Sequence, residues 1–317
     1  MSAATDEPVA ARLAAGAFLL IDKPRGPSSH QVTAWVRDLL GVERAGHAGT
    51  LDPNVSGLLW IGVGPALKLL PLVLEFPKRY VGVVAFHGEV APKELARTLE
   101  EFTGPVYQTP PVRSAVRRER RVRTIHRLEL VESDPPRVIL DVVADSGTYI
   151  RTLAVDLGEA LGVGGHLEEL RRVATGPFTE AQSVPLTALA DAVAAHLAGD
   201  PGRLLGLLHP IEEVWREFPT IVLRDAAASA VAHGAGLASG GILAIPRPFS
   251  TGAHVALVDR SGALVATGIA RHGSTEVGRV AHGWVVDGTR VFVDPARFPA
   301  RWRAGGAPGP DEHRGSR

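Results

Sequence analysis

The sequence contains no cysteine, and this absence excludes disulfide bonds, zinc fingers and thiol catalysis. Its 12 histidines are scattered and form no HExxH pair, so we expect neither a protein-bound metal nor any other cofactor. The Gly-Lys-Ser/Thr ending of a phosphate-binding loop is also missing. No run of about 18 apolar residues and no basic segment before an apolar core occurs, which predicts no membrane span and no secretory signal. We therefore expect a cytoplasmic protein.

Neither sign of charge is in excess, because 34 Lys and Arg balance 34 Asp and Glu. The balance argues against a surface that is basic throughout, although a local basic stripe is enough to bind phosphates. Lysine is scarce, with 4 lysines to 30 arginines, and a GC-rich genome is the explanation that we favour. With 317 residues, 45% of them hydrophobic, the chain is long enough for a large and a small domain.

The pattern of apolar and turn-forming residues predicts an α+β fold. The helix expected over 28–41 is capped by Ser28 or Ser29, repeats apolar residues at helical spacing and stops at Gly41. Segment 254–267 predicts a hairpin that turns at Asp259–Gly262. Further strands are expected over 17–21, 58–64, 79–88, 137–145, 220–224 and 289–294, and further helices over 92–104, 147–162 and 183–210.

Near residue 218 the expected structure changes from mixed helices and strands to short glycine-rich strands, which predicts a domain boundary. We expect a flexible N-terminus over 1–16 and an α+β catalytic body over 17–217. A small β-barrel-like module over 218–303 and a disordered Gly/Pro-rich tail over 304–317 complete the chain.

The stretch HAGTLDPNVSG places one carboxylate, Asp52, in a stiff loop. Because Pro53 follows it, Asp52 is held in an extended conformation, and the nearby glycines let the loop approach other groups closely. By spacing alone an Asx-Pro turn is the more common explanation. A nucleophilic carboxylate would need a guanidinium partner, and Arg151, after a glycine turn, is a candidate. Tyr80 either stacks on a planar base or belongs to the core.

Six arginines lie within the eleven positions 113–123: Arg113, Arg117, Arg118, Arg120, Arg121 and Arg123. A solvated charged hairpin is the ordinary explanation for such a run. Arginine suits phosphate contacts and stacking, so we favour RNA binding here.

Several stretches, in order, resemble the TruB-type pseudouridine synthases, and among them the dyskerin-like branch that forms the catalytic subunit of box H/ACA guide-RNA particles. The resemblance covers about residues 17–303, and its most specific motifs are GHAGTLDP, KRYVG, GTYIR and ELRRVATGPF. It implies a pseudouridine-synthase fold with a central mixed sheet, followed by a C-terminal PUA domain. It also implies isomerisation of uridine in RNA without a cofactor.

The resemblance further implies roles for single residues. Asp52 corresponds to the nucleophile, Arg151 to its partner and Tyr80 to the residue that stacks on the base. His47 corresponds to the histidine that supports the flipped RNA, and Leu170 to the apolar residue of the uracil pocket. Gly49, Thr50 and Lys23 fall in matching motifs as further substrate-binding candidates, and the arginine cluster falls in an RNA-clamping thumb loop.

The implied partners are RNA, namely tRNA, rRNA and an H/ACA guide RNA, together with small accessory core proteins. The chain departs from dyskerin-like relatives in its short segment before residue 17 and its neutral charge, which predicts greater reliance on partners. Two alternatives remain open: a stand-alone enzyme for the T-loop uridine of tRNA, and an RNA-binding scaffold without activity. A hydrolase with an aspartate nucleophile would need a second carboxylate, and no candidate lies near Asp52 in the sequence.

Overall fold

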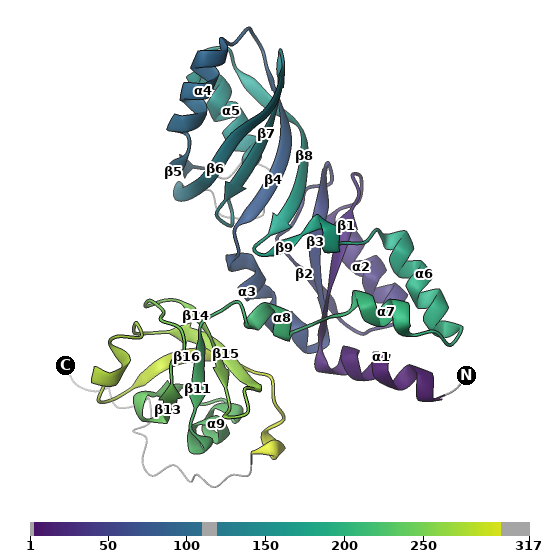
Figure 1. Ribbon diagram of the computed structural model, residues 1–317, viewed down its shortest axis with the longest axis vertical. Helices are drawn as coiled ribbons and strands as arrows, with labels where there is room; N and C mark the ends of the chain where they lie inside the picture. Colours follow the sequence, from purple (N-terminus) through teal and green to yellow (C-terminus); the bar gives the residue numbers. More distant parts are fainter. Residues whose placement is uncertain (1–2, 110–118, 299–317) are drawn as a thin grey trace, which may run out of the picture. The chain divides into compact units, whose positions relative to one another are not determined.

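The computed structural model describes residues 3–109 and 119–298, and the chain divides into two compact units, Met1–Val214 and Trp215–Arg317 (Figure 1). The boundary expected near residue 218 lies close to this division. The arginines Arg113, Arg117 and Arg118 and the tail expected over 304–317 lie outside the described residues.

A ten-stranded mixed sheet organises the first unit, with strand order β10-β1-β3-β8-β4-β7-β6-β5; β2 pairs with β3 and β9 with β8. Strand β8 is parallel to β3 and antiparallel to β4, so it joins two halves of the sheet. This arrangement confirms the α+β class with a central mixed sheet. The strands are β1 Ala17–Lys23, β2 Ala45–Ala48, β3 Val55–Val63, β4 Lys78–Phe86, β5 Gly104–Gln108, β6 Arg121–Asp134, β7 Arg137–Ala144, β8 Gly165–Thr175, β9 Phe178–Thr179 and β10 His209–Pro210.

Helices cover the two halves separately. Helices α4 and α5 lie side by side at the β4–β8 half, whereas α2 and α6 lie beside β1 and β3 (Figure 1). The segment expected to be helical over 183–210 contains two helices, α6 and α7, because the chain turns between them at Gly199, where φ is 101°. The helices are α1 Ala3–Ala15, α2 Ser29–Leu40, α3 Leu70–Glu75, α4 Pro92–Glu101, α5 Ile150–Ala160, α6 Leu186–Leu197, α7 Gly202–Leu207 and α8 Glu212–Trp215, with 3₁₀ turns η1 Gly64–Leu69 and η2 Glu180–Gln182.

Helix α2 follows its sequence signals closely. The Ser28 side chain accepts a hydrogen bond from the Gln31 backbone and Gln31 returns one, forming a capping box, and Gly41 ends the helix with φ of 62°. Val32 and Val36 are fully buried, whereas Trp35 of the same predicted apolar stripe remains 46% exposed.

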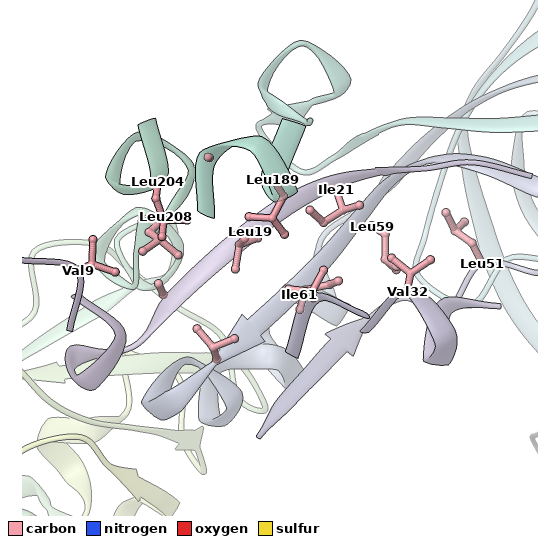
Figure 2. Close-up of a cluster of buried hydrophobic side chains, with 14 of the residues drawn as sticks. Val9, Leu19, Ile21, Val32, Leu51, Leu59, Ile61, Leu189, Leu204 and Leu208 are labelled. Atoms are coloured by element: carbon pink, nitrogen blue, oxygen red, sulfur yellow. The ribbon is translucent and has the colours of Figure 1, made fainter. Parts of the chain in front are cut away.

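Among the described residues of the first unit, two hydrophobic clusters lie next to the site. The first, shown in Figure 2, is built by β1, β3 and the helices around them and includes Val32, Leu51 and Leu59. The second lies between α4, α5 and the strands β4, β6 and β7. Tyr80 and Leu170 pack against both cores, which places them where the two halves of the sheet meet.

The N-terminal segment differs from the flexible stretch expected over 1–16, because it contains helix α1. Val9 is 3% exposed and joins the first core, and Leu13 packs against it. The Arg12 guanidinium donates a hydrogen bond of 2.8 Å to the Leu208 carbonyl. Val9 and Leu13, two apolar residues among small ones, thus anchor helix α1, although the composition of this segment predicted no contact with the core.

The second unit is a six-stranded sheet of order β12-β16-β15-β14-β11-β13 around its own core. The predicted hairpin is confirmed as β14 and β15, with a turn closed by the hydrogen bond from Gly262 N to Asp259 O. The strand expected over 289–294 begins earlier, at Trp284, and ends at Val291. The elements are β11 Thr220–Leu223, α9 Asp225–Ala232, β12 Leu237–Ala238, η3 Ser239–Gly241, β13 Ile242–Ala244, β14 His254–Val258, β15 Leu264–Ala270, η4 Val277–Arg279, β16 Trp284–Val291 and η5 Pro295–Arg297.

Candidate active site

Asp52 lies in the loop between β2 and β3, and its carboxylate pairs with the guanidinium of Arg151, the second residue of α5. The two side chains are 50% and 48% exposed, so the pair faces solvent. The loop closes through a hydrogen bond of 3.0 Å from Val55 N to Asp52 O. An ionised carboxylate held by a guanidinium at an open surface is able to act as a nucleophile.

The strand register places Tyr80 and Leu170 beside this loop. In the pairing of β4 with β8, Tyr80 lies opposite Arg172 and Gly82 lies opposite Leu170. In the parallel pairing of β3 with β8, Leu170 lies opposite Val55, the first residue of the strand that follows Asp52. The sheet therefore brings Leu170, far from Asp52 in the sequence, beside the first residue of the strand that follows the Asp52 loop, with Tyr80 on the next strand.

Arg172 is a buried cation of the site that the sequence did not single out. It is 1% exposed, and its Nε donates a hydrogen bond of 2.8 Å to Leu58 O. Burial lowers the pKa of Arg172, while a hydrogen bond and Coulombic attraction from Tyr80 oppose that shift. A Cβ on Gly49 would lie 2.9 Å from Arg172 Nη1, and φ of Gly49 is +69°. Glycine at 49 thus lets the Asp52 loop lie directly against this guanidinium.

His47 is held in one tautomer. The Thr33 hydroxyl donates to Ser29 O at 2.7 Å, so it must accept from His47 Nδ1, which lies 3.0 Å away. Burial, with the nearby charges of His30 and Arg172, lowers the pKa of His47. The ring is therefore neutral at neutral pH, and its Nε2 accepts from the Thr50 hydroxyl at 3.3 Å.

Lys23 is buried next to the Asp52 loop and is hydrogen-bonded to it. Its side chain is fully buried, and its amine donates to the carbonyls of Pro24 and Pro27 at 2.8 Å and of Pro53 at 3.4 Å. Burial lowers the pKa of Lys23. The sequence suggested substrate contact for this residue, and the structure shows its hydrogen bonds going to backbone carbonyls of the segment between β1 and α2 and to Pro53, the residue after Asp52.

The structure describes only the C-terminal end of the arginine cluster. Arg120 lies with its guanidinium carbon 4.5 Å from the centre of the Tyr107 ring, and Arg121 is the first residue of β6. Arg123 lies against the turn that leads to Arg151, because a Cβ on Gly147 would be 3.3 Å from Arg123 Nη2.

Within residues 3–109 and 119–298, no group of three or more His, Asp or Glu side chains is arranged to hold a metal ion. Among the helices of these same residues, none is long and apolar enough to cross a membrane.

Three family profiles match the chain in succession. Residues 37–150 match the TruB family pseudouridylate synthase N-terminal domain, and residues 151–215 match the tRNA pseudouridylate synthase B C-terminal domain. Residues 219–292 match the PUA domain.

Curated relatives match over nearly the whole chain. A probable tRNA pseudouridine synthase B of Pyrobaculum arsenaticum is 47% identical over 289 residues, which cover 91% of this chain and 87% of the relative. The protein of the same name from Methanothermobacter thermautotrophicus is 42% identical, with 89% and 88% covered.

Solved structures share the fold over a similar span. A chain of a Cbf5-Nop10-Gar1 complex superposes with a TM-score of 0.85 at 36% identity, covering 92% of this chain and 89% of that chain. A chain of an H/ACA RNP bound to a substrate RNA containing 2'-deoxyuridine gives a TM-score of 0.81 at 34% identity, with 93% and 90% covered. The chain therefore belongs to the TruB family of pseudouridylate synthases, which are isomerases, and it carries a C-terminal PUA domain.

Proposed function

We propose that Asp52 is the nucleophile with which this enzyme converts uridine to pseudouridine in RNA. The observation that carries the proposal is the Asp52–Arg151 ion pair, half exposed at the point where Tyr80 and Leu170 meet the two halves of the sheet. As the Asp52 carboxylate attacks the nucleoside, the N1–C1′ bond breaks and uracil detaches and rotates. A C5–C1′ bond then forms as the bond to Asp52 breaks, and the C5 proton passes to water. Arg151 keeps the carboxylate ionised and oriented.

The remaining residues of the site would bind a uridine that has been flipped out of the stacked RNA. Flipping a base out of stacked RNA costs a few kcal/mol, and an aromatic face returns about 1–3 kcal/mol. Tyr80 supplies this face and Leu170 the apolar wall of the pocket. His47, with Gly49 and Thr50 beside it, supports the displaced RNA, and Lys23 supports the loop.

We further propose that residues 17–217 form the catalytic domain and 218–303 the RNA-binding PUA domain. Solved relatives occur in Cbf5-Nop10-Gar1 and H/ACA assemblies, which supports an H/ACA guide RNA and small accessory proteins as partners. With these partners, we propose rRNA as one target. The names of the curated relatives favour tRNA, whose T-loop uridine is the alternative target of a stand-alone enzyme. Either activity belongs in the cytoplasm.

The test is tritium release from RNA labelled at C5 of uridine, with the full chain and the Asp52→Asn variant. We expect release with the wild type and a loss of at least about 10³-fold with Asp52→Asn, because the amide is no nucleophile. Asp38→Asn, which breaks an exposed ion pair with Arg37 on α2, is the matched control and should retain activity.

The same assay separates the alternatives. Release from tRNA alone favours the stand-alone enzyme, whereas release that requires guide RNA and accessory proteins favours the guided one. A wild type that is inactive on both substrates with all partners present would leave the non-catalytic scaffold as the function.

A further inference from the structure

Two buried side chains outside the ion pair each hold the backbone next to one of its members. Ser29, the first residue of α2, is fully buried, and Gln108, the last residue of β5, is 3% exposed. Neither residue contacts Asp52 or Arg151 through a hydrogen bond between side chains. Each forms two hydrogen bonds with the backbone of a single residue close by.

Ser29 holds the residue immediately before Asp52. Its hydroxyl donates to Leu51 O at 2.9 Å and accepts from Leu51 N at 2.8 Å. The Leu51 side chain is 4% exposed and belongs to the first core together with Val32 and Leu59 (Figure 2). Leu51 is thus fixed by both its backbone and its side chain, and the carbonyl that Ser29 binds belongs to the peptide joining Leu51 to Asp52.

The backbone on the other side of Asp52 is held as well. Pro53 O accepts a hydrogen bond of 2.8 Å from Gly26 N and a longer one, at 3.4 Å, from the Lys23 amine. Because the backbone of both Leu51 and Pro53 is held by hydrogen bonds, the motion left to Asp52 is mainly rotation of its side chain.

Gln108 holds the turn that leads into α5. Its Oε1 accepts from Tyr149 N at 2.9 Å, and its Nε2 donates to Tyr149 O at 3.1 Å. Tyr149 is the residue that precedes α5, and Arg151 is two positions further on. Gln108 therefore sets where the helix begins and from which direction the Arg151 guanidinium approaches.

We propose that Ser29 and Gln108 are positioning residues, one for each member of the Asp52–Arg151 pair. The inference rests on the proposed role of Asp52. Removing the Ser29 hydroxyl leaves Leu51 N–H and C=O without this partner, and removing the Gln108 amide leaves the half-buried Tyr149 N–H without its partner, although Tyr149 O keeps a hydrogen bond of 3.0 Å from Leu153 N. The freed backbone shifts one member of the pair against the other. A displacement of about 1 Å at a reacting group costs about 10²-fold in rate, even when the altered residue does not touch the substrate.

The experiment compares Ser29→Ala, Ser29→Cys and Gln108→Met with the wild type in single-turnover tritium release, well below every melting temperature. We expect the rate at saturating RNA to fall roughly 10- to 100-fold for Ser29→Ala and Gln108→Met. Binding of the same RNA should change by less than about twofold, because both side chains are buried and present almost no surface to a bound RNA. Ser29→Cys, of similar size but with a weaker donor and acceptor, should lie between serine and alanine.

The double variant tests whether both residues act through one pair. If they do, Ser29→Ala with Gln108→Met loses less than the product of the two single losses. The matched control is Ser239→Ala, which removes a serine hydroxyl that donates to Val280 O at 2.7 Å in the second unit and should keep the wild-type rate.

The possible results distinguish failure of this inference from failure of the proposed function. Single variants that melt at lower temperature but keep the wild-type rate would show a purely structural role and overturn this inference, as would losses that multiply fully. An inactive wild type would instead overturn the proposed function, and the inference with it.

Discussion

At the scale of the residue, the exposed Asp52–Arg151 pair is flanked by backbone to which the buried Ser29 and Gln108 are hydrogen-bonded. The pattern around Asp52 is rich enough in glycine and proline to predict a stiff loop, although spacing alone leaves a structural turn as the commoner explanation. Arg172 and Gln108 were not singled out from the sequence, and Ser29 was considered only as a helix cap, because the roles of all three depend on burial and on partners that only the fold brings close. A single sequence shows a serine or an arginine, but not that it lies beneath a loop.

Lys78 gives the clearest pH dependence at this scale. Burial, together with the positive charge of Arg172, lowers the pKa of Lys78 from 10.5 to about 7. Between these values the unfolded chain binds more protons than the folded one, so the free energy of unfolding rises with pH. We expect a rise of up to about 1.4 kcal/mol per pH unit from pH 7 to 10.

Urea unfolding of the wild type and Lys78→Met at several pH values checks this slope. Methionine has no proton to lose, so its curve should be flatter over the same window. Equal slopes for the two proteins would show that another group carries the pH dependence.

At the scale of the element, no strand was predicted over 165–175, although ELRRVATGPF was noted as a family motif, and the pairing of β8 on both sides was not predicted either. Strand and helix periodicity depends on neighbours along the chain, whereas register depends on a partner strand more than a hundred residues away. The close approach of β3 to β8 is an example: a Cβ on Gly57 would lie 2.2 Å from Arg172 O.

Gly57→Ala should therefore unfold or severely destabilise the first unit. φ of Gly57 is +100°, and the added Cβ meets backbone, which has no room to yield. We expect a loss of about 3 kcal/mol or more in the free energy of unfolding. Gly104→Ala is the matched control, because φ is +116° with nothing within 4 Å, so it should lose only about 1–2 kcal/mol. If urea unfolding shows similar losses of stability for Gly57→Ala and Gly104→Ala, the cause at Gly57 is not steric.

At the scale of the whole molecule, a neutral chain has to bind RNA through local charge. The exposed Arg121 at the start of β6 is the described member of the cluster best placed to contact a phosphate. The sequence predicted a solvated surface for this run, since charge runs rarely enter a core, and the described Arg120 and Arg121 are exposed.

Removing that charge should change the salt dependence of RNA binding. We expect Arg121→Gln to reduce the slope of log K against log salt concentration by about 0.7–0.9, because one fewer counterion is released. Filter binding across a salt series measures the slope. Arg37→Gln, which removes an arginine already paired with Asp38, is the control and should leave it unchanged. An unaltered slope in Arg121→Gln would place the phosphate contacts elsewhere.

The position of β8 within the sheet also sets an order of events during synthesis. The strand spans Gly165–Thr175, and it pairs with β3 along one edge and with β4 along the other. A growing chain that has emerged from the ribosome only as far as Arg151 already contains Asp52, Tyr80 and Arg151 but lacks the strand that brings them together. The aspartate loop is translated more than a hundred residues before β8, so its surroundings are complete only after Thr175 has left the exit tunnel.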